Sequence, residues 1–311
     1  MIRLRPTDVL RPRFLLGVTR RRLRVRLGAL MGRDIAVDLG DGFRLRLPAR
    51  DSLVRKLLED DFERPERDFI TRTLRPGDVF VDVGANIGVH AIVAARAVMP
   101  GGRVYALEPN PATFRALERN VAANGFNGTV RCICVAASDA AGVASLHVPG
   151  AGYAAHSSLA DPHMPLAGEI EVEVAQLDDL VQDSPALVKI DVEGWERHVI
   201  AGAHRLLSAR DAPHLLVEFA DLASAYAGTT TDELAADFER LGYRLFRYDH
   251  RARELAMEQR PGRYGGNLVA SKRIDELRAR IGKQEAVSAS GKRGICQDLR
   301  DPKFGAHNAG R

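Results

Sequence analysis

The sequence predicts an α/β fold in which a mainly parallel sheet ends in an antiparallel hairpin. From residue 76 onward, strand-like and helix-like segments alternate, which is typical of a parallel sheet covered by helices on both faces. Residues 79–98, VFVDVGANIGVHAIVAARAV, form an apolar strand-like run that breaks at a glycine loop and continues as a helix. Residues 243–249 and 266–272 are two strand-like segments without a helix between them, which favours an antiparallel hairpin at the sheet edge.

The segment before this alternating region predicts two further elements. Residues 34–48 alternate apolar and polar side chains around Gly-Asp-Gly, which is the pattern of a β-hairpin. Residues 52–74 carry leucine and phenylalanine at helical spacing, which predicts a helix interrupted near Pro65.

Cap residues mark where several helices of the alternating region begin and end. Asn110 and Pro111 suit the start of a helix and Gly125 suits its end. Thr230 and Glu233 predict a capping box for a later helix. The predicted elements, in order, are strand 79–83, helix 88–98, strand 102–109, helix 110–124, strand 129–137, short strands 143–148 and 170–174, strand 186–192, a helix from about Gly194, strand 214–220 and the helix after Thr230.

Basic residues crowd the N-terminus of a chain with an ordinary globular composition. The 311 residues carry a formal net charge of +4, yet residues 1–27 hold nine arginines against the single acid Asp8. Such an arm could contact an anionic surface, and a solvated arm is the simpler interpretation. No run approaches the ~20 apolar residues that a membrane span needs, and three cysteines make no disulfide framework. We therefore expect a cytoplasmic protein.

The glycine loop and a later acid predict a site for a ribose-bearing ligand. Gly84 permits a tight turn out of the strand, and Gly88 would let the helix N-terminus approach a ligand closely. Glu108 ends the next strand, 20 residues after Gly88. Because the ends of adjacent strands meet in one crevice, its carboxylate suits the two hydroxyls of a ribose.

The sequence of this loop fits S-adenosylmethionine better than it fits NAD. The loop reads G-x-N-x-G, whereas a pyrophosphate of NAD is usually held by G-x-G-x-x-G. Asp82 stands just before the loop, where its negative charge would repel phosphates, and a terminal edge hairpin is not expected of a dinucleotide domain. S-adenosylmethionine is a positively charged nucleoside without a phosphate. It is therefore compatible with the loop pattern, with the negative charge of Asp82 and with the edge hairpin.

Four segments, DVGANIG, EPNP, VKIDVEGWE and HLLVEFA, together resemble the FkbM family of S-adenosylmethionine-dependent methyltransferases. The resemblance covers residues 51–272. It implies a class I methyltransferase fold, which is a Rossmann-like mixed seven-stranded sheet with a C-terminal antiparallel edge hairpin. It also implies O-methylation of a sugar, glycan or natural-product hydroxyl. The residues that match the family's cofactor site are Asp82, Gly84, Ala85, Asn86 and Gly88 in the loop, and Glu108 at the ribose.

The resemblance and the composition divide the chain into four segments. A basic arm is expected at residues 1–33, a hairpin and helix cap at 34–75, and the methyltransferase domain at 76–272. Residues 273–311 are expected to form a disordered tail whose start could be a short helix, because most of this segment lacks hydrophobic periodicity.

Three acids near strand ends are the candidates for the chemistry. Asp191 ends an apolar strand and is the first choice for a base or a substrate orienter, with cofactor binding or helix capping as the alternative. Glu193 is expected in the first turn of the next helix, where the helix dipole would stabilise it in any case. Glu218 could orient the acceptor or complete a site with Asp191. Lys189 shares a strand face with Asp191 and could pair with it, hold it ionised or simply lie under the site.

The three acids could also hold a magnesium ion, which prefers oxygen ligands. No histidine pair at metal-ligand spacing supports a transition-metal site, and we predict no required metal.

The segment after the third strand should border the adenine and the acceptor. Ser138 and Asp139 are expected near the adenine, although Asp139 is as well explained as a turn residue. Residues 152–161 contain small residues together with His156, Ser157 and Ser158, which suit a mobile loop over the cofactor or the acceptor. Trp195 is expected to pack in the core or to stack on a sugar.

Three other functions fit the sequence less well than methyl transfer does. A non-catalytic S-adenosylmethionine-binding scaffold would keep the loop but lose the acids at 191, 193 and 218, which this chain retains. An NAD-linked oxidoreductase is disfavoured by the loop pattern. A nucleic-acid methyltransferase would suit the basic arm, but no Asn/Asp-Pro-Pro-Tyr segment follows the fourth strand and the arm offers few aromatics for base stacking. The expected partner is therefore a small-molecule or glycan acceptor, and no nucleic acid.

Overall fold

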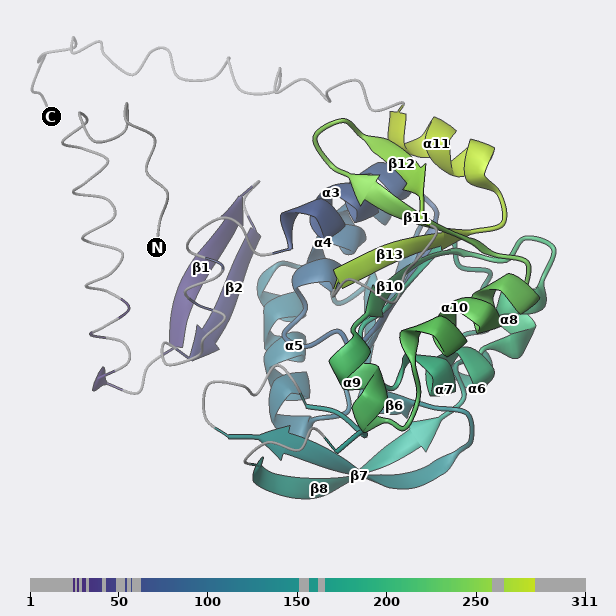
Figure 1. The fold of residues 1–311 in the computed structure, drawn as a ribbon. Coiled ribbons are helices and arrows are strands. Elements are labelled where there is room, and N and C mark those ends of the chain that lie inside the picture. The colour runs from purple at the N-terminus through teal and green to yellow at the C-terminus, as the bar shows by residue number, and fades with distance from the viewer. Residues whose placement is uncertain are drawn as a thin grey trace, which may run out of the picture.

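The computed structural model describes residues 34–40, 43–48, 63–150, 157–161, 166–258 and 266–282, with a few helical residues between 25 and 57. An eight-stranded mixed sheet forms the centre, and helices cover both of its faces (Figure 1). From one edge to the other its strands are β12 (Glu254–Met257), β11 (Arg244–Asp249), β13 (Gly266–Ser271), β10 (His214–Phe219), β9 (Leu187–Ile190), β3 (Val79–Val83), β4 (Arg103–Leu107) and β5 (Val130–Ile133).

The directions of these strands confirm the predicted class I methyltransferase architecture. Strands β5, β4, β3, β9 and β10 are parallel neighbours, and β13 is antiparallel to both β10 and β11. The predicted edge hairpin is therefore present, with β13 inserted between β10 and β11. The prediction of seven strands was one too few, because residues 254–257 fold back on β11 as β12. The carboxylate of Asp249 turns the chain there by accepting hydrogen bonds from the backbone N–H groups of Arg251 and Ala252.

Two hydrophobic layers sandwich the sheet. One face packs on α3 (Arg64–Thr73), α4 (Val89–Val98), α5 (Pro111–Ala123) and α11 (Ile274–Gly282). The other packs on α6 (Leu177–Leu180), α7 (Glu196–Ala201), α8 (His204–Ser208) and α10 (Thr231–Arg240). Alternate residues of each parallel strand enter the two layers, which explains why these strands read as continuous apolar runs. The short helix α9 (Asp221–Tyr226) follows β10.

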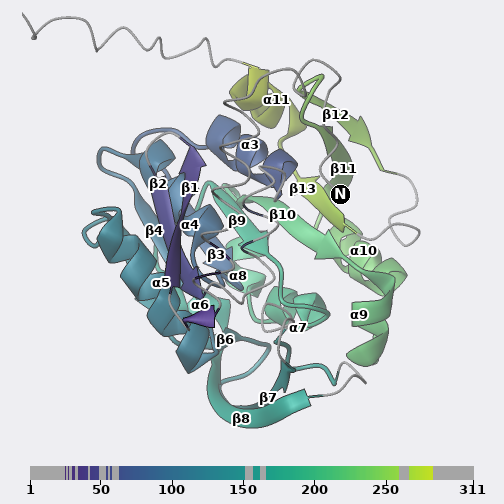
Figure 2. The same ribbon diagram turned by 90° about the vertical axis from the view of Figure 1, so that its left-hand side faces the viewer.

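Two small sheets flank this domain. The predicted hairpin at 34–48 is β1 (Asp34–Gly40) with β2 (Phe43–Pro48). It docks on α5, because the amide groups of Asn120 and Asn124 accept hydrogen bonds from the backbone of Arg46 and Arg44. A three-stranded sheet of β6 (Ala136–Ala137), β8 (Leu166–Ala175) and β7 (Gly142–Pro149) lies at one end of the domain (Figures 1 and 2).

Some strand and helix boundaries in the structure differ from the predicted ones. The segment 129–137 is not one strand, because residues 136–137 leave β5 and pair with β8 as β6. The helix predicted at 52–74 is described as α3 only from Arg64, with Pro65 in its first turn. The cap at Asn110 and the capping box of Thr230 are confirmed.

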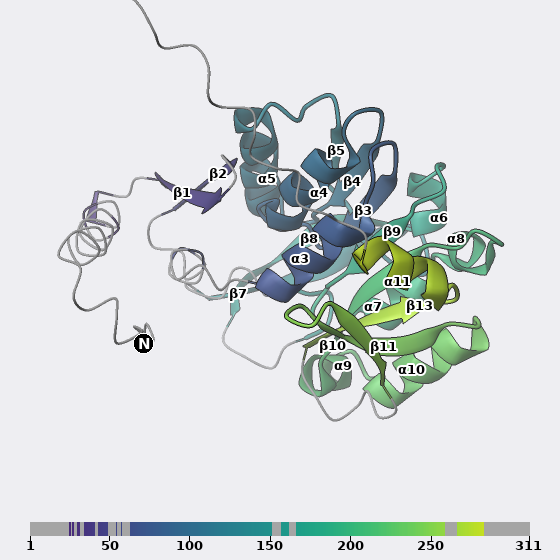
Figure 3. The same ribbon diagram turned by 90° about the horizontal axis from the view of Figure 1, so that it is seen from above.

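The segment predicted as a C-terminal tail begins with a packed helix. Helix α11 lies against α3 (Figure 3), with Ile274, Leu277 and Ile281 buried. Arg280 fixes its end by an ion pair of 2.6 Å with Asp78. Residues 283–311 and the arm up to residue 24 lie outside the described residues, so the proposed contact of the arm with an anionic surface stays a prediction. None of the described helices has the length and apolar character to cross a membrane.

We predict that Leu277→Ala lowers the free energy of unfolding by about 2–5 kcal/mol, because Leu277 is fully buried between α11 and the domain. Asp275→Ala on the same helix is the control, since its side chain is 96% exposed and should contribute less than about 1 kcal/mol. Urea denaturation of both variants provides the measurement. Equal stabilities would contradict the packing of α11 on the domain.

Candidate active site

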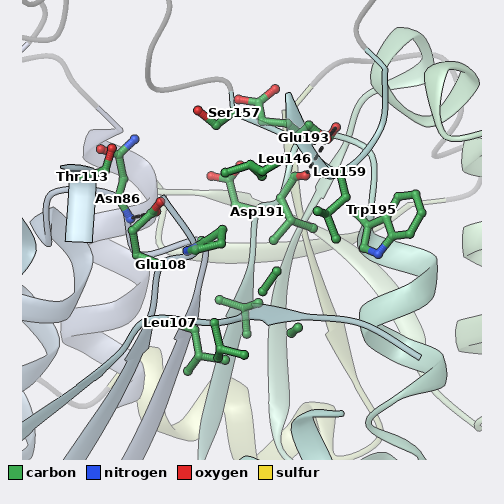
Figure 4. Close-up of a pocket in the computed structure, with 18 residues that line it drawn as sticks. Asn86, Leu107, Glu108, Thr113, Leu146, Ser157, Leu159, Asp191, Glu193 and Trp195 are labelled. Carbon is green, nitrogen blue, oxygen red and sulfur yellow. Dashed lines mark hydrogen bonds between the residues drawn. The ribbon is translucent and has the colours of Figure 1, made fainter. Parts of the chain in front are cut away.

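A pocket opens where β3, β4 and β9 end, at the carboxyl edge of the parallel strands (Figure 4). Three acids line it, namely Glu108, Asp191 and Glu193, and the indole of Trp195 lines its other side. Among the described residues that line this pocket, none is Lys or Arg. The remaining wall is mainly apolar and includes Val135, Ala136, Ala137, Leu146 and Leu159. The pocket therefore suits a ligand with an apolar part and a neutral or cationic part better than it suits a phosphate ester.

The glycine loop after β3 is shaped by close backbone packing. Gly84 has φ +80°, and a Cβ atom there would lie 1.9 Å from the backbone oxygen of Asp191. Gly88 has φ +95°, and its Cβ would lie 2.7 Å from Leu117 of α5. Gly84 thus lets the loop approach the end of β9, whereas Gly88 allows α4 to pack on α5. The expected close approach of a ligand at Gly88 is not what its surroundings favour, since Gly88 does not line the pocket.

Glu108 is anchored by two backbone N–H groups. Its carboxylate accepts hydrogen bonds from Asn86 N at 3.0 Å and from Asn110 N at 2.9 Å. Asn86 has a left-handed backbone conformation, φ 50°, and its own side-chain oxygen accepts from Ile87 N. Burial raises the pKa of Glu108 to about 7, against the lowering effect of the two N–H groups. The orientation of this carboxylate is therefore fixed by the loop that precedes α4 together with the N-cap residue of α5.

Lys189 lies beneath the pocket, between two carboxylates. Its Nζ is 2.9 Å from Asp191 Oδ2 and 3.9 Å from Asp82 Oδ1, which confirms the pairing with Asp191 predicted from the strand periodicity. Both Lys189 and Asp82 are almost completely buried. Burial raises the pKa of Asp82 to about 6, against the lowering effect of Lys189. Burial lowers the pKa of Lys189, but the carboxyl groups of Asp191, Asp82 and Glu63 outweigh this and raise it above its ordinary value.

The carboxyl groups of the three predicted catalytic acids lie close together. One carboxyl oxygen each of Asp191, Glu193 and Glu218 lies within 4.8 Å of the others, a spacing that could also hold a metal ion. Glu193 has a left-handed backbone, φ 54°, which is unfavourable for a residue with a side chain and often marks a functional position. Burial, and then the nearby charges of Asp191 and Glu193, raises the pKa of Glu218 well above its ordinary value.

A buried acid shapes the turn that carries Glu193. Glu196 Oε1 accepts hydrogen bonds from Val192 N at 3.1 Å and Gly194 N at 3.2 Å. Gly194 has φ +103°, and a Cβ there would lie 2.2 Å from the backbone oxygen of Ala223 in α9. Helix α7 begins at Glu196. Glu193 therefore precedes the helix and does not lie in its first turn, which corrects the expectation from sequence.

Ser138 and Asp139 do not line the pocket. Ser138 Oγ accepts a hydrogen bond from the indole N–H of Trp195 at 3.1 Å and donates one to Asp139 Oδ1 at 3.0 Å. The indole also stacks on the ring of His198, with ring centroids 3.7 Å apart. Ser138 thus orients Trp195, which is one of the residues that line the pocket. The other predicted cofactor residues, Asp82 and Ala85, are buried beside the pocket.

The segment between β6 and β9 contributes two pocket residues that the sequence motifs did not identify, Leu146 of β7 and Leu159. Ser157 and Ser158, which were named in the segment predicted to fold over the site, also line the pocket, and Ser158 Oγ donates to Glu193 O at 2.7 Å. His156 lies outside the described residues. The signal that could have found Leu146 and Leu159 is weak, because isolated leucines in a polar excursion are common.

Comparisons with known proteins match the chain to methyltransferases. The family model described as "Methyltransferase FkbM domain" matches residues 82–245. Over 161 residues the chain is 36% identical to "31-O-demethyl-FK506 methyltransferase FkbM" of Streptomyces tacrolimicus, covering 42% of this chain and 60% of that protein. Over 154 residues it is 32% identical to "Hexuronic acid methyltransferase AglP" of Haloferax volcanii, covering 47% of this chain and 59% of that protein. The chain thus spans about three fifths of the length of these two curated relatives.

Among solved structures, the chain resembles a crystal structure of methyltransferase FkbM from Methylobacillus flagellatus. The sequence identity is 18% and the TM-score is 0.41, covering 82% of this chain and 60% of that chain.

We predict that Gly84→Ala destabilises the protein far more than Gly77→Ala does. Both glycines have similar φ angles, +80° and +89°, but a Cβ at Gly77 has nothing within 4 Å. Gly77→Ala should therefore cost only the left-handed strain of about 1–2 kcal/mol, and Gly84→Ala at least about 2 kcal/mol more. Thermal unfolding of both variants measures the difference. Equal losses would mean that the loop does not pack against the end of β9.

Proposed function

Because this chain belongs to the FkbM methyltransferase family, we propose that it transfers the methyl group of S-adenosylmethionine to a hydroxyl oxygen of a sugar, glycan or natural-product acceptor. The observation that carries this proposal is the pocket at the ends of β3, β4 and β9, which combines three carboxylates with an apolar wall. The name of one relative specifies an O-demethyl substrate and that of another a hexuronic acid, which supports an oxygen acceptor.

The residues of the pocket fit S-adenosylmethionine. The fixed, buried carboxylate of Glu108 would accept hydrogen bonds from the ribose hydroxyls. Trp195 and the apolar wall would contact the adenine, and the negative charge of the lining would favour the sulfonium. When bound, S-adenosylmethionine supplies an electrophilic methyl group whose transfer leaves a neutral thioether.

Asp191 is the residue that we assign as the general base. Its carboxylate faces the pocket and is held by the ammonium of Lys189, which fixes its orientation and stabilises its charge. As the acceptor oxygen bonds to the methyl carbon, its proton would pass to the carboxylate of Asp191. Much of the remaining rate would come from holding the acceptor oxygen in line, which requires positioning rather than further proton transfer.

Glu218 and Glu193 would orient the acceptor. The raised pKa of Glu218 keeps it protonated at neutral pH, so it can donate a hydrogen bond to the acceptor but is a poor proton acceptor. The carboxyl group of Glu193, which lies in the strained turn before α7, is close to those of Glu218 and Asp191.

We predict that the dissociation constant for S-adenosylhomocysteine rises as the pH falls. Glu108 has a pKa of about 7, so it becomes protonated below that pH and loses its charge toward the ribose. Between pH 8 and pH 6 the dissociation constant should increase about tenfold. Isothermal titration measures it.

Glu108→Gln should bind weakly with a flat pH dependence, whereas Glu118→Gln, at an exposed position of α5, should behave as the wild type. Tighter binding of NAD than of S-adenosylhomocysteine would contradict the cofactor assignment.

Asp191→Asn should lower kcat by about 10²–10⁴-fold, because the amide cannot accept the proton. The affinity for S-adenosylhomocysteine should change only a few fold. Methyl transfer from tritiated S-adenosylmethionine to a panel of methyl glycosides provides the assay, with Asp179→Asn on α6 as an exposed control. Loss of cofactor binding together with activity would instead place Asp191 among the cofactor ligands.

A further inference from the structure

A second polar cluster lies beside Asp191 and does not line the pocket described above. We call it the α3 cluster, and its members come from α3 and the residue before it, from α4, from β10 and from β13. They are Glu63, Glu66, Arg67, His90, Glu218 and Asn267.

The sheet register brings this cluster together with the catalytic acids. Glu218 on β10 pairs with Asn267 on β13, so their side chains share one face of the sheet. Asn267 Nδ2 donates a hydrogen bond to Glu66 Oε1 at 3.2 Å, across 201 residues of sequence. Glu218 in turn lies within 4.8 Å of the carboxylate of Asp191. A continuous line of polar groups therefore runs from the general base to the start of α3.

A second contact joins the residue before α3 to helix α4. Glu63 Oε2 lies 3.1 Å from His90 Nε2. Burial raises the pKa of Glu63 to about 8 and lowers that of His90 well below its ordinary value, so this pair is neutral at pH 7. The cluster thus has uncharged as well as charged polar groups.

Five buried atoms of the α3 cluster lack a hydrogen-bond partner among the described residues. They are Glu66 Oε2, Arg67 Nε, His90 Nε2, Glu218 Oε2 and Asn267 Oδ1. Leaving a buried polar atom unpaired costs about 1–3 kcal/mol, and folded proteins pair the large majority of such atoms. Five such atoms in one cluster, with Glu218 beside the general base, would be paired if a polar molecule were bound there.

We propose that the α3 cluster is the acceptor subsite and that it takes a neutral, polyhydroxylated acceptor such as a pyranoside. This inference rests on the proposed methyl transfer. A hydroxyl group both donates and accepts, which matches the N–H of Arg67 together with the oxygens of Glu66 and Asn267. An anionic acceptor would face the Glu66 carboxylate, and an ammonium group would face Arg67 and the nearby Lys189, so neither complements the mixture as well.

In this arrangement Asn267 is a specificity-determining residue. It holds a hydroxyl of the acceptor that is not methylated, while Glu218 orients the neighbouring one toward Asp191. Its replacement should weaken binding of the acceptor without altering the cofactor pocket, which Asn267 does not line.

The test is saturation-transfer NMR on the complete chain with S-adenosylhomocysteine bound. The probes are methyl α-D-glucopyranoside and methyl α-D-galactopyranoside as neutral polyols, methyl α-D-glucopyranosiduronate as an anion, and cyclohexanol as a mono-alcohol. The variants are Asn267→Leu, which keeps the number and branching of the side-chain heavy atoms but removes both polar groups, and Asn127→Leu, an exposed control in the turn before β5. Titration with S-adenosylhomocysteine checks that each variant keeps its fold and cofactor site.

We expect a signal from at least one neutral glycoside, at least threefold weaker in Asn267→Leu and unchanged in Asn127→Leu, with equal affinity for S-adenosylhomocysteine in all three proteins. No signal from either neutral glycoside, an equal signal in Asn267→Leu, or a stronger signal from the anion or cyclohexanol would overturn the proposal, with ordered water as the remaining occupant of the cluster. Failure of the wild type to bind S-adenosylhomocysteine would instead contradict the proposed function itself.

Discussion

The buried ammonium group of Lys189 is the interaction on which the rest of the site depends. It bridges Asp82 of β3, which is fully buried, and Asp191 at the end of β9, which lines the pocket. Removing a charge from water costs several kcal/mol, and this cost is offset only when the charge is well paired. The trio therefore fixes two adjacent strand ends in one arrangement, and it keeps Asp191 oriented toward the pocket.

The shape of the pocket depends on two places where backbone segments pack closely against each other. The loop after β3 contacts the carbonyl of Asp191 at Gly84, and the turn after β9 contacts α9 at Gly194. Glu196 closes this turn from within by accepting two backbone N–H groups. Because a Cβ atom fits at neither glycine, the positions of Glu108, Asp191 and Glu193 relative to one another are set mainly by backbone packing, which suits a reaction that depends on alignment.

Sequence reasoning predicted those features that depend on residues close together in the chain. The caps at Asn110 and Thr230, the strand–helix alternation and the pairing of Lys189 with Asp191 follow from local periodicity. The features it missed depend on residues far apart. The role of Gly88 requires Leu117 of another helix, and the hydrogen bond from Trp195 to Ser138 spans 57 residues. The contact of Asn267 with Glu66 spans 201 residues, so no local pattern could reveal the α3 cluster.

The central claim is that the pocket between Glu108 and Asp191 holds S-adenosylmethionine. A crystal structure of the complete chain with S-adenosylhomocysteine tests this most directly. The account predicts both ribose hydroxyls within hydrogen-bond distance of the Glu108 carboxylate, the adenine beside Trp195, and the sulfur on the side of Asp191. An adenosine group bound elsewhere, or a ribose that does not contact Glu108, would contradict it.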